Sequence, residues 1–141
     1  MTNLSRDDVI QELNRLFAEE AEAVLRYMHL SNAVRGTDHL LVGPVLKQAL
    51  RQTMEHAEVI ARKLRTLGAV PKLDLSIALE PQSVDGREAL EMALTFEEAA
   101  LDAYQDALRR VEGDIPLEEF IREQIVVESE HVAELKQLLV E

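Results

Sequence analysis

Apolar residues recur along most of this chain at the three- and four-residue spacing of an amphipathic helix, in four separate stretches. The apolar stripes consist of Leu13, Phe17, Val24 and Tyr27 in the first stretch, Leu46, Ala49, Ile60 and Leu64 in the second, Leu90, Ala93, Leu101, Tyr104 and Leu108 in the third, and Leu117, Ile121, Leu135 and Leu138 in the fourth. No stretch of consequence shows the two-residue alternation of a half-buried strand. The pattern predicts an all-α protein with four long helices.

Capping and helix-breaking residues set the expected bounds of the first two helices. The hydroxyl of Ser5 can cap the first helix, which we expect to run to about Arg35, because Gly36 then supplies a stop. We expect the second helix to begin at Pro44, since proline suits the first turn of a helix, and to run to about Leu67. The segment before Pro44 is expected to be a connecting loop.

The second half of the chain predicts two more helices, over residues 86–111 and from about residue 116 to the end. Residues 69–85 form the longest irregular stretch, which can cross the long axis of a bundle and make the second and third helices parallel. The sequence therefore predicts a single domain over residues 1–141, a ferritin-like four-helix bundle with one long crossover between helices two and three.

Ionisable side chains interrupt the apolar stripes in all four predicted helices, at Glu20, His56, Glu97, Glu128 and His131. Charged groups are almost never buried without a partner, so these side chains require one. Glu128 and His131 are three residues apart and share a helical face. Convergence of carboxylates and imidazoles from four helices predicts a metal site in the core.

Less specific interpretations stay open for each residue taken alone. A core histidine such as His56 is often a hydrogen-bonded packing residue rather than a metal ligand. A shift of one position would let Glu19 replace Glu20, or Glu98 replace Glu97, on the inner face of its helix.

Composition narrows the choice of metal and partner. The chain has no cysteine, which excludes thiolate zinc sites and cysteine-ligated iron–sulfur clusters. The remaining nitrogen and oxygen ligands suit iron or manganese better than copper. The formal net charge is −12, which makes nucleic acid an unsuitable partner. The same negative charge attracts cations.

Neither the start of the chain nor its apolar stretches indicate a membrane protein. The first eight residues lack the basic start and apolar run of a signal peptide, and no continuous apolar stretch reaches membrane-spanning length. We therefore expect a cytoplasmic protein.

The motifs of the four helices resemble those of bacterioferritin across nearly the whole chain. The first helix contains LNRLFAEEA at residues 13–21 with Tyr27 seven residues after Glu20, the second contains TMEH at 53–56, the third contains Glu97, and the fourth contains ESEH at 128–131. The resemblance implies that Glu20, His56, Glu97, Glu128 and His131 bind one or two iron ions. It also implies iron storage with a ferroxidase-type site, in which Tyr27 lies beside the metals while oxygen or peroxide oxidises Fe(II).

Met54 matches the axial haem ligand of bacterioferritin, which each of two subunits supplies. The resemblance therefore implies a homodimer at least, with a higher assembly also open, and haem b as a second cofactor. A packing role for Met54 in a dimer interface is the alternative.

Two departures from the family pattern affect this prediction. Thr53 stands where the family has a bridging glutamate, and its neutral hydroxyl cannot bridge two cations as a carboxylate does. Glu55 and Glu58 are not expected to replace that glutamate, because Glu55 points away from the face of His56 and Glu58 lies obliquely to it. Only ten residues follow His131, so the fifth helix of bacterioferritin is not expected.

Two other classes of function remain as alternatives. One is a haem-binding or structural subunit with a degenerate metal site, which Thr53 favours. The other is a di-metal oxidase or rubrerythrin-like peroxidase, which ranks last because this chain has no cysteine-ligated rubredoxin domain.

Overall fold

The computed structural model describes residues 4–141, and residues 1–3, at the start of the segment inspected for a signal peptide, lie outside this range. Four helices account for most of the described chain: α1 (Arg6–Ser31), α2 (Asp38–Thr66), α3 (Gly86–Arg110) and α4 (Ile115–Leu138). Over residues 4–141 the only β-type pairing is one isolated bridge. The predicted all-α class is confirmed.

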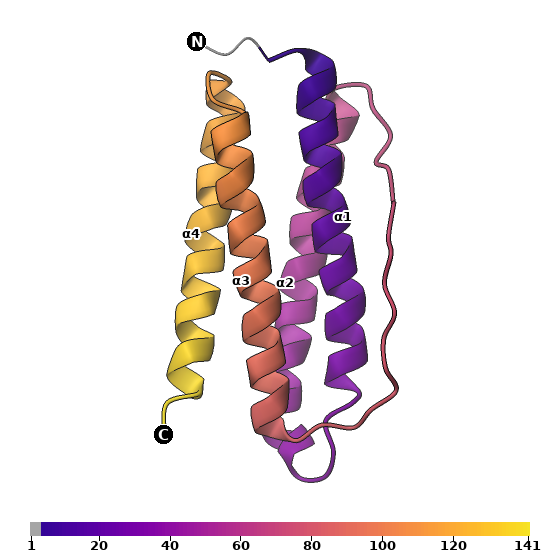
Figure 1. Ribbon diagram of the computed structural model, residues 1–141, viewed down its shortest axis with the longest axis vertical. Coiled ribbons are helices and arrows are strands. Elements are labelled where there is room, and N and C mark those ends of the chain that lie inside the picture. Colours follow the sequence, from indigo (N-terminus) through magenta and orange to yellow (C-terminus); the bar gives the residue numbers. More distant parts are fainter. Residues whose placement is uncertain (1–3) are drawn as a thin grey trace.

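The helices form a bundle of two hairpins (Figure 1). α1 packs against α2, α3 packs against α4, and α1 also contacts α3. The irregular segment between α2 and α3 runs along the length of the bundle, so these two helices point in the same direction (Figure 1). This arrangement confirms the predicted bundle with one long crossover.

The predicted cap at the start of α1 is also confirmed. The Ser5 hydroxyl accepts a hydrogen bond from the Asp8 N–H at 3.1 Å, and the Asp8 carboxylate accepts one from the Ser5 N–H at 3.2 Å. Such a capping box satisfies two backbone donors that the helix itself leaves unpaired. At the end of α2, Gly68 has a φ of 77°, a left-handed conformation that glycine adopts without steric cost.

The prediction that the first helix reaches Arg35 is wrong, because α1 ends at Ser31. The backbone beyond it pairs with the end of the crossover: the Val84 N–H donates to the Ala33 carbonyl and the Arg35 N–H donates to the Val84 carbonyl, each at 2.9 Å. Groups used in this pairing cannot continue the helical ladder. A contact with a residue some fifty positions away thus ends the helix.

The prediction that Pro44 begins the second helix is also wrong. α2 begins at Asp38, so Pro44 lies inside the helix. A proline inside a helix has no N–H to donate to the carbonyl four residues earlier. Its ring also usually clashes with that carbonyl and with the preceding residue. The preceding residue, Gly43, has no Cβ to clash with the proline ring, and the acidic Asp38 favours the first turn. These local features allow the helix to begin six residues earlier.

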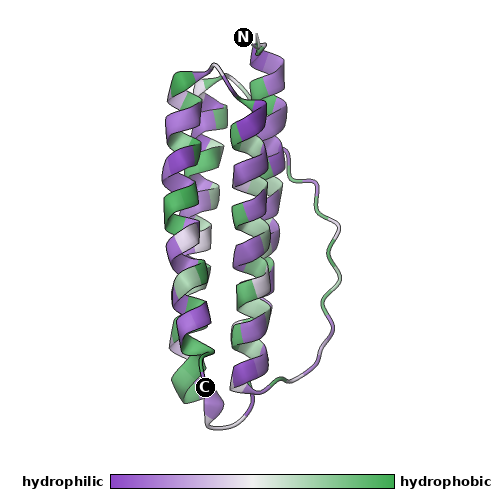
Figure 2. Cartoon of the chain, turned by 60° about the vertical axis from the view of Figure 1, so that its left-hand side comes forward, coloured by the Kyte–Doolittle hydropathy of each residue, from purple (hydrophilic) through white to green (hydrophobic). Residues whose placement is uncertain are grey.

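Buried apolar side chains form two clusters, one toward each end of the bundle. The cluster nearer the start of α1 includes Leu13, Leu16, Ile60, Leu64, Tyr104 and Ile121. The other includes Tyr27, Leu30, Leu46, Ala89, Ala93 and Leu135. Each helix also carries hydrophilic residues along its length (Figure 2). The middle of the core, between the two clusters, contains the ionisable residues described next.

Among residues 4–141, no helix combines the length and apolarity that crossing a membrane requires.

Candidate metal centre

Each helix of the bundle contributes an ionisable side chain to the middle of the core. Glu20 and Glu128 are each 2% exposed and Glu97 is 5% exposed, while the side chains of His56 and His131 are 13% and 14% exposed. Burial to this degree is rare for carboxylates. The structure therefore brings together all five residues that the sequence marks as candidate ligands, from α1, α2, α3 and α4.

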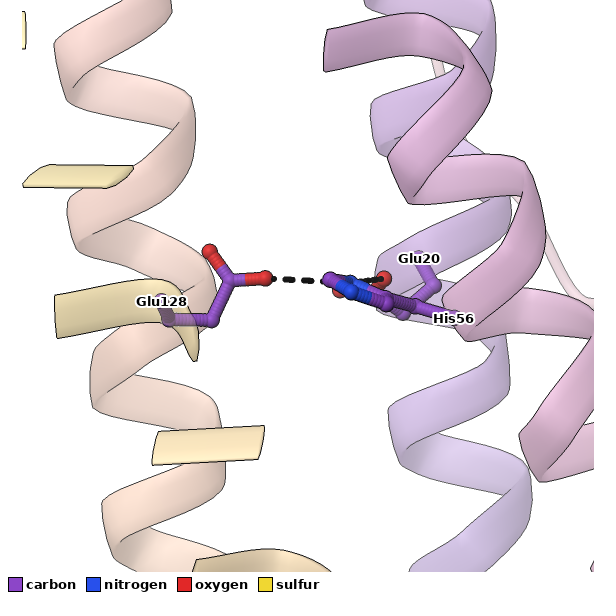
Figure 3. Close-up of side chains that lie close together, drawn as sticks. All are labelled: Glu20, His56 and Glu128. Atoms are coloured by element: carbon purple, nitrogen blue, oxygen red, sulfur yellow. Dashed lines mark ion pairs between the residues drawn. The ribbon is translucent and has the colours of Figure 1, made fainter. Parts of the chain in front are cut away.

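The first group of ligand-type atoms consists of Glu20, His56 and Glu128. His56 lies between the two carboxylates, and its Nδ1 atom is 3.3 Å from Glu20 Oε2 and 3.2 Å from Glu128 Oε1 (Figure 3). These three residues come from three different helices. We refer to this group as the first triad.

The second triad consists of Glu97, Glu128 and His131. Here His131 Nδ1 is 3.7 Å from Glu97 Oε1 and 3.8 Å from Glu128 Oε2. In each triad the nitrogen and oxygen atoms lie within 4.8 Å of one another. Glu128 belongs to both triads, with Oε1 directed toward His56 and Oε2 toward His131.

Unsatisfied buried atoms make the two triads candidate metal sites. Glu20 Oε2, His56 Nδ1 and Glu128 Oε2 are fully buried, and their contacts within the triads lack the geometry of a hydrogen bond. Native proteins leave few buried polar groups unsatisfied, because each one loses its hydration without compensation. Carboxylate oxygens and imidazole nitrogens directed at a common point are the donors that a divalent iron or manganese ion takes.

Mutual contact shifts the pKa values of the ionisable groups. Burial lowers the pKa of His56, but the nearby carboxylates of Glu128 and Glu20 outweigh this effect and raise it to about 9. The neighbouring Glu128 and Glu97 raise the pKa of His131 to about 10. Burial raises the pKa of Glu97 to about 7 and also raises that of Glu20. In the metal-free protein, protonated histidines thus supply the positive charge that these carboxylates require.

Glu128 shows the opposite shift from the other two carboxylates. Burial favours its neutral form, but His131 and His56 together hold the pKa of Glu128 well below its usual range. Glu128 is therefore ionised across the physiological pH range.

Tyr27 lies beside the second triad. Its hydroxyl donates a hydrogen bond of 2.7 Å to Glu97 Oε1, and the side chain is 1% exposed. Burial and the adjacent Glu97 raise the pKa of Tyr27 above its ordinary value, so its hydroxyl remains protonated. Such a hydrogen bond orients the carboxylate of a prospective metal ligand.

Thr53 occupies the inner face of α2, three residues before His56, and is buried. Its hydroxyl donates to the Ala49 carbonyl at 2.7 Å, within its own helix. Glu55 and Glu58, the neighbouring acidic residues of α2, are exposed, and neither belongs to a triad. The position that mirrors Glu128 on α2 thus has no carboxylate.

Met54 lies away from this centre, because its side chain is 52% exposed on the outer surface of α2. Two further residues, Tyr104 and Gln124, have side-chain oxygens that are buried without a hydrogen-bond partner, and neither is among the residues that the sequence predicts for the site. The available sequence signal was that Tyr104 follows Glu97 by seven residues, as Tyr27 follows Glu20.

A cavity of about 90 Å³ adjoins the second triad. Its walls include Tyr27, Leu46, Ala93, Glu97, His131 and Leu135. It is large enough for one or a few small molecules, and two prospective ligands line it.

Comparison with solved structures finds the same fold in several bacterial proteins. A ferritin-like diiron-carboxylate protein from Bacillus anthracis str. Ames is 26% identical, with a TM-score of 0.82 over 99% of this chain and 100% of that one. The bacterioferritin of Desulfovibrio desulfuricans is 24% identical, with a TM-score of 0.84 over 98% and 83% of the two chains.

A dodecameric thioferritin from Bacteroides fragilis is 23% identical, with a TM-score of 0.83 over 96% of this chain and 86% of that one. No curated protein matches the chain. The model of the ferritin family, described as a ferritin-like domain, matches residues 10–141, which is nearly the whole chain. The protein therefore belongs to the ferritin family.

Proposed function

We propose that this protein binds iron at the two triads and oxidises Fe(II), as a bacterioferritin-like protein with an altered ferroxidase site. The position of Glu128 carries this proposal, because its two oxygens face the histidines of different triads, 3.2 and 3.8 Å away. A carboxylate so placed can bridge two metal ions. The three buried carboxylates also require positive charge nearby, which metal ions would supply once the histidines are deprotonated.

Each ion would have one glutamate and one histidine of its own and would share Glu128 with the other ion. Glu20 and His56 would hold the first ion, Glu97 and His131 would hold the second, and Glu128 would contact both. Because a histidine binds metal in its neutral form, His56 and His131 must each release a proton when the ions enter. Metal would then replace the positive charge that the protonated imidazoles supply.

When bound, iron supplies one-electron chemistry toward oxygen or peroxide. The protein contributes a site between two apolar clusters that limits access of water. Tyr27 holds Glu97 through its hydrogen bond of 2.7 Å and is placed to donate a hydrogen bond or an electron. The cavity beside Glu97 and His131 gives a small oxidant a place next to the second triad.

Thr53 explains why we propose an altered site rather than a complete one. Two divalent ions bring four positive charges, against three carboxylates from Glu20, Glu97 and Glu128. One positive charge therefore stays uncompensated, and one bridge is absent. Slower Fe(II) oxidation than in a site with a fourth carboxylate follows from both differences.

The relatives support this proposal at the level of the family. The Bacillus anthracis protein is described as a ferritin-like diiron-carboxylate protein, and the Desulfovibrio desulfuricans structure as a bacterioferritin with a diiron site. The Bacteroides fragilis protein is a dodecamer. We extend the proposal to an assembly of at least two copies, each forming one domain over residues 1–141, and to iron storage in the cytoplasm.

A second candidate function is haem binding between two copies of the chain through Met54. The supporting observation is that this thioether is half-exposed on the outer surface of α2, where a partner could reach it. Protein produced with haem b supplied should then show a haem absorption spectrum that persists after chelation, and Met54→Leu should abolish it. A colourless wild-type protein under these conditions rules out this candidate.

The test of the main proposal is a crystal structure of protein soaked anaerobically with Fe(II), with anomalous scattering at the iron edge. Two peaks, one in each triad, are the expected result. A single peak would mean that the protein retains one ion, and it would overturn the proposal that two iron ions take part in the oxidation. No peak at either triad overturns the iron proposal. A crystal prepared without iron provides the control.

A further inference from the structure

The cavity of about 90 Å³ beside the second triad is also close to Thr53. Ala49 and Gln52 of α2 line this cavity. Gln52 is the neighbour of Thr53 in the chain, and the Ala49 carbonyl accepts the hydrogen bond of the Thr53 hydroxyl. Glu97 of α3 and His131 of α4 form another part of the wall. The cavity therefore adjoins both the ligands of the second triad and the part of α2 that lacks a carboxylate.

The direction of helical side chains connects this space with the missing glutamate. A long side chain on a helix leans toward the N-terminus and covers the turn before its own Cα. At position 53 that turn contains Ala49, which has a small side chain and lines the cavity. A glutamate at position 53 would thus extend over Ala49 toward the cavity, whereas the shorter Thr53 is bonded to the backbone. The cavity is therefore space that a longer carboxylate side chain would help to fill.

The proposed metal centre lacks both negative charge and ligands. Two divalent ions would face three carboxylates, from Glu20, Glu97 and Glu128, so one positive charge stays uncompensated. An uncompensated charge is unfavourable in a protein interior. Each ion would have three protein ligands, and a Zn(II) ion with three protein ligands takes its next ligand from solution or substrate. One monoanion bound to metal would supply both the charge and a ligand.

The walls of the cavity suit a small anion once metal is bound. Gln48 and Gln52 carry side-chain amide groups, which can donate hydrogen bonds to an anion. Gln48 and Glu134 are exposed, so the cavity communicates with solvent. In the metal-free protein the carboxylates of Glu97 and Glu134 would repel an anion. Since about 15 Å³ of such space holds one water molecule, the cavity has room for a small carboxylate.

We propose that this cavity binds a small monoanion with two oxygen donors, of the class of formate, acetate and bicarbonate, which ligates the ion of the second triad. The anion supplies from solution the carboxylate that α2 lacks at Thr53. This inference rests on the proposed metal function and makes the binding of metal and the binding of anion mutually dependent. The cavity has room for more than one small molecule, so the anion leaves a place for an oxidant.

The affinity for Zn(II), a redox-inert substitute for Fe(II), tests this inference without any oxidation chemistry. We would compare calorimetric titrations in formate and in perchlorate at equal ionic strength, in buffer freed of carbon dioxide. Formate should raise the Zn(II) affinity of the wild-type protein by about ten-fold, a typical coupling between two ligands. Formate also binds free Zn(II) weakly, which lowers the apparent affinity, so a rise must come from the protein.

Three variants locate the effect. Thr53→Glu carries its own carboxylate, so its Zn(II) affinity should not depend on formate. Ala49→Leu fills the cavity and should also abolish the dependence on formate. Thr53→Val is the matched control, because it adds no charge and should keep the dependence. Thermal unfolding in chelator checks that each variant is folded.

Co(II) gives a second and independent readout, because this ion is paramagnetic. Wild-type protein loaded with Co(II) should broaden the proton NMR signal of formate. The broadening should be much smaller in Thr53→Glu and in Ala49→Leu. Protein loaded with Zn(II), which is diamagnetic, provides the control.

The possible results separate this inference from the function on which it rests. If the protein binds no Zn(II) or Co(II), with or without formate, the metal function and the anion site both fail. If metal binds with an affinity that formate does not change, only the anion site is overturned, and water completes the centre. An effect that persists in both Thr53→Glu and Ala49→Leu means that formate binds elsewhere, which also overturns the site. An equal effect of chloride overturns the assignment to an anion with two oxygen donors.

Discussion

The hydroxyl of Thr53 donates a hydrogen bond to the carbonyl oxygen of Ala49, one turn earlier on the same helix and 2.7 Å away. Its oxygen is thus held by the backbone of α2 instead of facing the centre as an anionic ligand. Thr53 mirrors Glu128, since each stands three residues before the histidine of its hairpin. The candidate metal centre is therefore asymmetric, because only one of the two hairpins has a carboxylate three residues before its histidine.

Thr53→Glu should accelerate Fe(II) oxidation, by roughly ten-fold or more, because it supplies a second bridge and the missing negative charge. The same change should destabilise the metal-free bundle, since it adds a fourth buried carboxylate. Stopped-flow oxidation and thermal unfolding in chelator measure the two effects. Thr53→Val is the control, expected to oxidise Fe(II) at the wild-type rate. Unchanged oxidation kinetics in Thr53→Glu count against the assignment of this position.

Glu128→Gln should weaken binding at both triads at once, because each loses one of its three ligands. We expect calorimetric titration with Zn(II) to show a loss of at least about 100-fold in affinity, because losing a ligand costs more than losing a group that only hydrogen-bonds to a ligand. Glu130→Gln is the matched control, since Glu130 is exposed two residues away on the same helix. If the two variants bind Zn(II) equally well, Glu128 is no ligand.

Tyr27→Phe removes the hydrogen bond to Glu97 but keeps the aromatic ring that packs edge-on against Phe96. The fold should lose only about 1 kcal/mol of unfolding free energy, a typical value for one hydrogen bond. Zn(II) affinity at the second triad should fall by about ten-fold. Calorimetry and urea unfolding test the two parts separately. A large loss of stability with full affinity would identify Tyr27 as a packing residue only.

Metal-free protein should lose stability as the pH rises from about 7 to 10. A group whose pKa is raised on folding stabilises the fold below its unfolded pKa and loses that contribution as the pH passes its folded pKa. His56 and His131, with pKa values of about 9 and 10 against 6.5 when unfolded, follow this rule. The contribution of Glu97 is already lost by about pH 7, and Glu128 contributes throughout.

Thermal unfolding in chelator at pH 7 and pH 9.5 measures this effect, with an expected fall in Tm on the order of 5 °C. Saturating Zn(II) should reverse the trend, because metal binds the deprotonated histidines. The double variant His56→Gln/His131→Gln serves as the control and should show a flat profile in this range. A wild-type Tm that is independent of pH in chelator would contradict the pKa values of the histidines.

The sequence predicts the four-helix fold, but it does not predict where α1 ends or where α2 begins. The helical spacing of apolar residues and the cap at Ser5 are local signals, and the structure confirms both. The end of α1 at Ser31 depends on the bridge between Val34 and Val84, which no local pattern records. The early start of α2 depends on how one proline, Pro44, is accommodated in a helix.

For the candidate site, the helical periodicity of the sequence predicts which ionisable side chains face the core. Helical spacing predicts Glu20, Glu97 and Glu128 on the inner faces, and their burial in the structure decides against Glu19 and Glu98. Their roles as ligands stay predictions. Tyr104 fits the apolar stripe of the third predicted helix, and the missing hydrogen-bond partner of its hydroxyl becomes visible only in three dimensions.

The long crossover separates an N-terminal hairpin from a C-terminal hairpin. The two hairpins contribute different numbers of residues to the two triads. The C-terminal hairpin carries Glu97, Glu128 and His131, so the second triad is complete within one contiguous half of the chain. The first triad takes Glu20 and His56 from the N-terminal hairpin and Glu128 from the C-terminal hairpin, so it forms only after the hairpins have docked. During folding, an ion captured by the second triad would thus be able to organise the local hairpin first. Occupancy of the first triad would then report the assembly of the whole bundle.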